Sequence, residues 1–93
     1  MKIFERELAA RDAYGLSDLE AAMYVALIER LGRTVSHEYL SYRMYWRYDV
    51  MPLTIRSTKK RLVRRLPDDQ VIIATYGAGY RLTVPEGWQP PWA

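Results

Sequence analysis

Residues 54–66 read TIRSTKKRLVRRL, and ten residues later residues 76–82 read YGAGYRL. The first stretch predicts a helix, because Ile55, Leu62 and Leu66 lie seven and four residues apart and share one helical face. The second predicts a tight β-hairpin, because Gly77 and Gly79 tolerate the positive φ angles of such turns. The first stretch also carries six cations and no acid: Arg56, Lys59, Lys60, Arg61, Arg64 and Arg65. A basic helix followed by a tight hairpin is typical of a helix that enters the major groove of DNA beside a β-wing.

The bulk composition limits the chain to one ordinary globular domain. It has 93 residues, of which 49% are hydrophobic and 27% charged, with no cysteine and one histidine. Disulfides and cysteine or histidine metal clusters are therefore excluded, and we expect no metal and no cofactor. No run of about 18 apolar residues is present to span a membrane, and the first residues carry acids where a signal peptide is apolar. We expect a cytoplasmic, nucleoid-associated protein.

Positive charge is concentrated in the middle of the chain. Residues 1–29 hold three bases and six acids, for a net charge of −3. Residues 30–66 hold ten bases and two acids, for +8, and residues 67–93 hold one base and three acids, for −2. This asymmetry favours a nucleic-acid partner for the central third.

Three helices and two strands are predicted around the basic stretch. Ser17 and Glu20 form a capping box at the start of the first helix, and Ser36 caps the second. Pro52 keeps Met51 out of the α region, so a loop precedes the basic helix. The helices are expected at about 17–31, 36–47 and 53–66, and the strands at 71–76 and 80–84.

The sequence does not decide the structure of either end of the chain. Phe4, Leu8 and Ala9 are compatible with a short amphipathic helix, whereas residues 2–4 suit a strand equally well. The Pro/Trp-rich residues 85–93 predict no regular structure. Their tryptophans either fold back onto the domain or dock a partner or a second copy.

Four motifs occur in a recognisable order over about residues 16–84. They are Leu16-Ser17-x-x-Glu20, Gly32-x-x-Val35-Ser36-x-Glu38-x-Leu40, Arg61-Leu62-x-x-x-Leu66 and Gly77-x-Gly79-Tyr80-Arg81-Leu82. In this arrangement the chain resembles the OmpR/PhoB-type winged-helix effector domain of bacterial response regulators. The resemblance implies an α+β winged helix-turn-helix with a three-helix core and a C-terminal β-hairpin wing. It divides the chain into an N-terminal extension (1–15), the DNA-binding domain (16–84) and a tail (85–93).

The chain also departs from this family. About fifteen residues are too few for the family's N-terminal sheet, and Tyr45-Trp46 stand where a Trp-Gly pair often ends the second helix. Arg56 occupies a position that is usually acidic. The 93 residues include no counterpart of the family's receiver domain with its phosphorylated aspartate, so we do not expect phosphorylation control to carry over. The small size is compatible with a standalone bacterial or phage regulator.

The resemblance and the charge pattern both indicate double-stranded DNA as the partner. The candidate DNA-binding residues are Arg56, Ser57, Lys60, Arg61 and Arg64 on the basic helix, Tyr76 and Arg81 on the wing, and His37 and Arg43 on the second helix. Arginine grips a guanine edge with two hydrogen bonds, and lysine neutralises phosphate. Three alternatives stay open: the charge run is only a solvated face, His37 is only a surface residue, and Arg81 pairs with Asp68 or Asp69.

The rival interpretation is a protein-interaction module that binds its partner through the aromatic second helix and the tail. The second helix is rich in aromatic residues, and three roles stay open for them. They pack in the core, donate hydroxyl hydrogen bonds to DNA phosphates, or form a surface for a partner protein. In the resembled family the loop corresponding to residues 46–53 can touch RNA polymerase, which makes polymerase or another regulator a possible partner. A homodimer on a repeated or palindromic site is also a reasonable expectation. No nucleophile–base pair or phosphate-cradling loop is present, so we expect neither an enzyme nor a small-molecule substrate.

Overall fold

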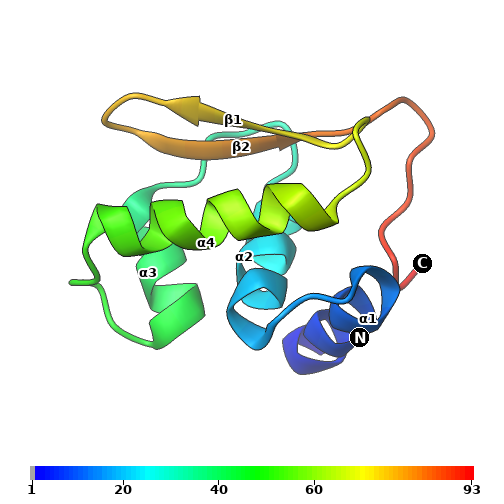
Figure 1. Ribbon diagram of the computed structural model, residues 1–93, viewed down its shortest axis with the longest axis horizontal. Coiled ribbons are helices and arrows are strands. Elements are labelled where there is room, and N and C mark those ends of the chain that lie inside the picture. The colour runs from blue at the N-terminus through cyan, green and yellow to red at the C-terminus, as the bar shows by residue number, and fades with distance from the viewer. Residues whose placement is uncertain (1) are drawn as a thin grey trace.

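The computed structural model describes residues 2–93, which form an α+β fold of four helices and one antiparallel hairpin (Figure 1). Every predicted helix and strand is present, with small shifts at the ends. The elements are α1 (Ile3–Tyr14), α2 (Asp18–Glu29), α3 (His37–Tyr45), α4 (Pro52–Arg65), β1 (Val71–Thr75) and β2 (Gly79–Thr83).

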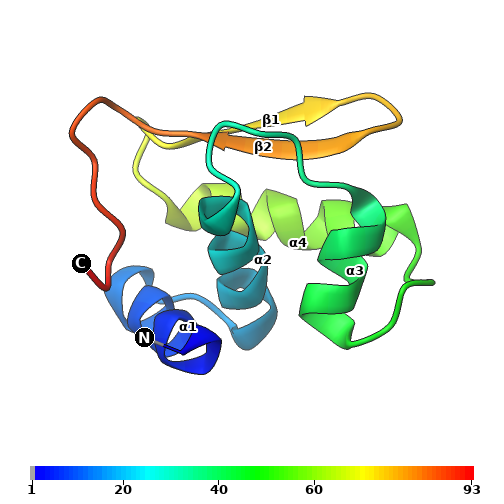
Figure 2. The ribbon, with the colours of Figure 1, turned by 180° about the vertical axis from the view of Figure 1, so that it is seen from behind.

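Helix α2 is the centre of the molecule. Its capping box forms as predicted: the Glu20 amide donates to Ser17 Oγ at 3.1 Å, and the Ser17 amide donates to Glu20 Oε1 at 3.2 Å. All residues from Ala21 to Leu27 are buried, which is typical of a helix covered on all sides. Helices α1, α3 and α4 and strand β2 supply that cover (Figure 2).

The N-terminal segment is a helix rather than a strand. Helix α1 packs along α2 and ends at Gly15, which adopts a left-handed φ of 66°. Ala10 is fully buried in the main core, so α1 adds a fourth helix to the three that were expected. Its packing face differs from the predicted one, because Phe4 is 69% exposed.

The hairpin is fixed to the helices by its second strand. Ile72 pairs with Leu82 across the two strands, and both side chains are buried on the inner face. The backbone of Tyr80 exchanges two hydrogen bonds with Val35, at 2.7 and 3.0 Å. These bonds hold the hairpin over the segment that joins α2 to α3.

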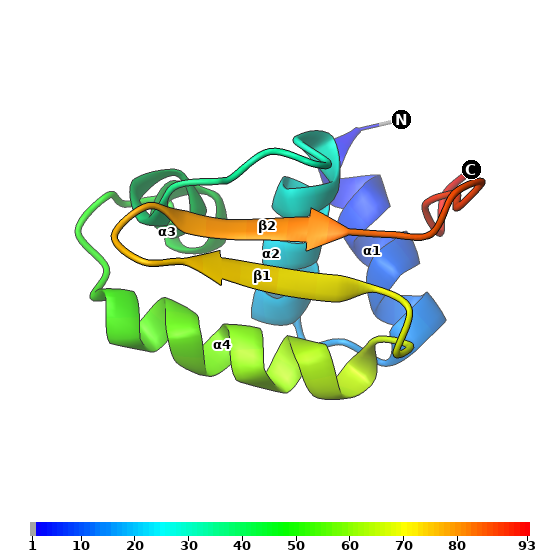
Figure 3. The ribbon, with the colours of Figure 1, turned by 90° about the horizontal axis from the view of Figure 1, so that it is seen from above.

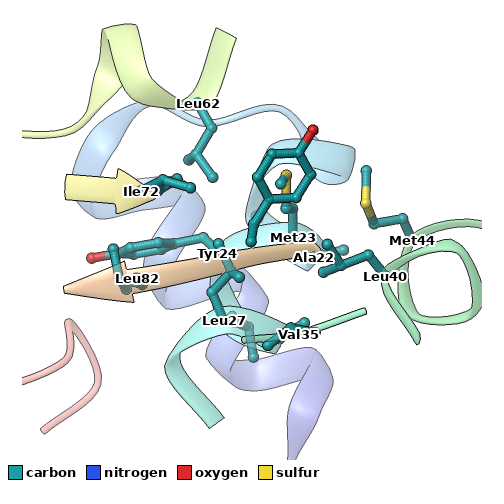
Figure 4. Close-up of a cluster of buried hydrophobic side chains, with 14 of the residues drawn as sticks. Ala22, Met23, Tyr24, Leu27, Val35, Leu40, Met44, Leu62, Ile72 and Leu82 are labelled. Carbon is teal, nitrogen blue, oxygen red and sulfur yellow. The ribbon is translucent and has the colours of Figure 1, made fainter. Parts of the chain in front are cut away.

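The core gathers side chains from every helix and from both strands. Figure 4 shows Tyr24 and Leu27 of α2 among residues of α3, α4 and the hairpin. The buried Tyr24 hydroxyl donates to Gln70 Oε1 at 2.5 Å, and Gln70 donates in turn to the Tyr14 hydroxyl at 3.0 Å. Burial raises the pKa of Tyr24 far above its usual value, so this phenol stays neutral.

The C-terminal tail has no helix or strand, as predicted, but it is not detached. Trp88 and Trp92 are partly buried against the core. The Arg6 guanidinium lies 5.4 Å from the centre of the Trp92 ring. Of the open alternatives for the tail, the structure has the one in which it folds back.

Among residues 2–93, none of the helices has the length and apolar character needed to cross a membrane.

Candidate nucleic-acid interface

Helix α4 buries one stripe of side chains in the core, and its other side chains lie on three further flanks. Ile55, Thr58 and Leu62 are fully buried, and Leu66 just beyond the helix is 7% exposed, as the apolar stripe predicts. Pro52 opens the helix at its first position, where its missing amide hydrogen costs nothing. The side chains outside the core stripe divide into an outward flank, a flank that faces α2 and a flank that faces the hairpin.

The outward flank carries three cations in one line. Arg56, Lys60 and Arg64 are exposed and lie four residues apart, so they are neighbours on the helix surface. None of the three forms an ion pair with any acid among residues 2–93. Like charges at this spacing weaken a helix, so the line is not there to stabilise the fold. We refer to Arg56, Lys60 and Arg64 as the cation stripe.

Ser57 lies beside the stripe and is exposed, but its hydroxyl donates to the Leu53 carbonyl of its own helix at 3.1 Å. Its oxygen remains able to accept a further hydrogen bond. Ser57 therefore lies next to the exposed cations on the outer face of the helix, as predicted.

The second flank joins α4 to α2 through a buried carboxylate. Glu20 is 2% exposed, and its oxygens lie 3.6 Å from Arg61 Nε and 3.9 Å from Arg65 Nε. Arg61 also donates to Thr58 Oγ1 at 3.1 Å, and Arg65 donates to the Gly15 carbonyl at 3.0 Å. Arg61, a predicted DNA contact, thus has a structural partner that the cation stripe lacks.

The third flank borders a groove between α4 and the hairpin, which lie side by side in Figure 3. The cavity measures about 790 Å³. Its lining consists of His37, Pro52, Leu53, Arg56, Lys59, Ala74, Tyr76, Gly77 and Tyr80. We call this feature the α4–hairpin groove. It brings together three predicted contacts, His37, Arg56 and Tyr76.

Aromatic and cationic groups are interleaved along the groove. The His37 ring meets the Tyr80 ring edge-on, with centroids 5.4 Å apart, and Lys59 Nζ lies 6.0 Å from the Tyr80 centroid. Burial raises the pKa of Tyr80, although the charge of Arg56 works in the opposite direction. Tyr76 stands fully exposed at the turn. Lys59 was not among the predicted contacts, because its spacing from Ile55 and Leu62 placed it, with Thr58, on the predicted core face.

Arg43 does not belong to this surface. Only 8% of its side chain is exposed, and its guanidinium is hydrogen-bonded to the Glu29 carboxylate and, at 3.0 Å, to the Tyr39 hydroxyl. Burial disfavours the charged form, but these two partners outweigh it and raise the pKa of Arg43. The expected phosphate contact has no support here, since α2 and α3 enclose this cation between them.

Arg81 points away from the groove. It pairs with Ile73 in the hairpin, and successive side chains of a strand alternate, so Arg81 occupies the face opposite Tyr80. The alternative ion pair with Asp68 or Asp69 is not formed among residues 2–93. Arg81 remains a partly exposed cation on the outer face of the hairpin.

The loop before α4 is internally braced. Ser41 is 1% exposed, and its hydroxyl donates to the Arg47 carbonyl and accepts from the Val50 amide at 3.1 Å. Arg47 holds Asp49 through two hydrogen bonds of 2.6 and 2.9 Å, which lowers the pKa of the Asp49 carboxyl. Nothing in the sequence distinguished Ser41 from a surface serine.

The described part of the chain holds no group of three or more histidine and carboxylate side chains placed to bind a metal. In the comparisons with known proteins, no protein-family model matches the chain, and neither a curated protein nor a solved structure matches it.

Proposed function

We propose that the chain is a small winged-helix regulator of transcription that binds double-stranded DNA in a sequence-specific manner. In this proposal α4 enters the major groove, and the hairpin acts as the wing on the adjacent backbone or minor groove. The observation that supports it best is the cation stripe. Arg56, Lys60 and Arg64 are exposed and have no carboxylate partner within residues 2–93, whereas most other arginines there have one.

The arginines and the lysine of the cation stripe suit different contacts on the duplex. Arg56 and Arg64 can each form a bidentate pair with a guanine edge, and Lys60 suits a phosphate. Lys59 and Arg81 are further candidates for the backbone. A single helix of this kind reads few base pairs, so two copies on a repeated or palindromic site are expected to raise specificity.

Salt dependence offers a quantitative test. If three or four cations neutralise phosphates, log K should fall with log salt with a slope of about −3 to −4. On a duplex of random sequence, where Arg64 lies against a phosphate instead of a guanine edge, the chain with Lys60→Gln and Arg64→Gln should bind more weakly by at least about tenfold, with a slope shallower by about two. Fluorescence anisotropy of a labelled duplex, first of random sequence and then selected from a random pool, measures both quantities.

The matched control removes two charges elsewhere. Lys2→Gln with Arg11→Gln alters exposed or partly exposed positions on and next to α1 and leaves the cation stripe intact. This control should retain the wild-type slope to within about one unit if the stripe is the contact surface. Absence of duplex binding at about 50 mM salt, or equal losses in the two double variants, would overturn the proposal.

A further inference from the structure

Large apolar side chains are exposed on both rims of the α4–hairpin groove. Leu53 on the α4 rim is 68% exposed, and Tyr76 on the hairpin rim is fully exposed. Met51, directly before the helix, is also 68% exposed. A sugar–phosphate strand offers little apolar surface to cover such groups, whereas aromatic residues and methionine are enriched where proteins meet. Exposed apolar groups gathered around a groove indicate an interaction site.

The charges within the groove restrict the chemistry of its occupant. Arg56 and Lys59 both line it, and its nine lining residues include no acid. Burying these cations against a neutral apolar partner would leave them without compensation, which is costly. An occupant that carries carboxylates beside an apolar group satisfies both features.

The groove is formed in advance of binding. Its hairpin wall is anchored by the two backbone hydrogen bonds between Tyr80 and Val35, and its helical wall by the fully buried Ile55 and Thr58. A preformed wall does not have to be ordered when a ligand arrives, which lowers the cost of association.

We propose that the α4–hairpin groove binds an acidic peptide segment of a partner protein. One large apolar side chain of the peptide lies between Leu53 and Tyr76, and its carboxylates pair with Arg56 and Lys59. The groove and the cation stripe share Arg56, so on the proposed function a bound peptide competes with DNA. Such a partner would act as a regulator of DNA binding.

Selection from a random peptide library tests this directly. Phage-displayed 12-residue peptides are panned against the full chain, with the Leu53→Ser, Tyr76→Ser chain as the counter-target. Both substitutions are at exposed positions, so the fold should survive, which circular dichroism checks. The enriched peptides should combine at least two acidic residues with one large apolar residue.

A synthetic fluorescein-labelled copy of the most enriched peptide is then titrated by fluorescence anisotropy. Its affinity should fall about tenfold or more in Leu53→Ser and in Lys59→Gln, as expected when a buried anchor or charge pair is lost. The matched control is Lys60→Gln, the neighbouring outward cation, which should change affinity by less than about twofold. Unlabelled duplex DNA should displace the peptide.

Three results would overturn the inference. One is the absence of enrichment over the counter-target. Another is a set of enriched peptides that lack acids or bind Leu53→Ser undiminished. The third is a Leu53→Ser chain that binds no peptide but loses duplex affinity as much as Lys60→Gln with Arg64→Gln, since the groove would then belong to DNA. Peptide binding that duplex DNA does not displace would contradict the competition and leave the groove site standing.

Discussion

Gly79 is the residue on which the position of the hairpin depends. It has a φ of +144°, and a Cβ placed there would lie 1.9 Å from the Val35 carbonyl oxygen. Gly79→Ala should therefore force the hairpin away from residues 35–36 and add backbone strain, with a combined loss of about 3 kcal/mol of unfolding free energy. Urea denaturation measures this loss. Gly77→Ala is the matched control, because Gly77 has a φ of +74° with no neighbouring atom within 4 Å, and it should cost about 1 kcal/mol. Equal losses in the two variants would contradict the close approach to Val35.

Trp46 presents the opposite case, a large side chain where glycine is the usual choice. It caps α3 with a left-handed φ of 62°, and among residues 2–93 no other non-glycine residue has a positive φ. Because both Trp46→Gly and Trp46→Ala remove the indole, their difference isolates the backbone. We expect the glycine variant to be more stable than the alanine variant by about 1 kcal/mol, the reverse of their order inside a helix. The melting temperatures of the two variants test this, and an alanine variant of equal or greater stability would contradict it.

At the scale of elements, helix α4 illustrates how far sequence reasoning reaches. The spacing of Ile55, Leu62 and Leu66 predicted the buried face correctly. The cations off that face, Arg61 and Arg64 among them, looked equivalent, because residue spacing gives the angle of a side chain around the helix but not which residue of another element lies beside it. The structure separates them, since Glu20 of α2 lies beside Arg61, while Arg64 forms no ion pair in the part of the chain that the structure describes.

The same limit explains the two largest gaps at this scale. Arg43 was expected at the surface, but Glu29, fourteen residues earlier, lies against it once α2 and α3 pack together. The α4–hairpin groove is assembled from His37, from two turns of α4 and from the hairpin, so no contiguous motif encodes it. Local signals were more reliable: the Ser17 and Ser36 caps are present, and Met51 before Pro52 lies outside the α region.

At the scale of the whole molecule, the two ends of the chain share one set of contacts. Arg6 of α1 lies 3.9 Å from Glu29 of α2 and 5.4 Å from the Trp92 ring of the tail. The tail is thereby held against the first helix. The sequence left this arrangement open, because a proline- and tryptophan-rich segment has no periodicity from which a docking face can be read.

The fold-back of the tail predicts a measurable role in stability. Trp92→Ala should remove a half-buried ring and its contact with Arg6, at a cost of about 2 kcal/mol. For a domain of this size that cost corresponds to a fall in melting temperature of roughly 10 °C. Gln89→Ala is the matched control, since Gln89 is exposed in the same tail and its loss should be nearly neutral.

Thermal unfolding at two protein concentrations about a hundredfold apart distinguishes this role from docking onto a second copy. A contact within one chain stabilises independently of concentration, whereas a contact between copies stabilises more as concentration rises. We therefore expect the same Trp92→Ala difference at both concentrations. A difference that appears only at the higher concentration would assign Trp92 to an interface between copies, and the tail would then link two molecules instead of the two ends of one.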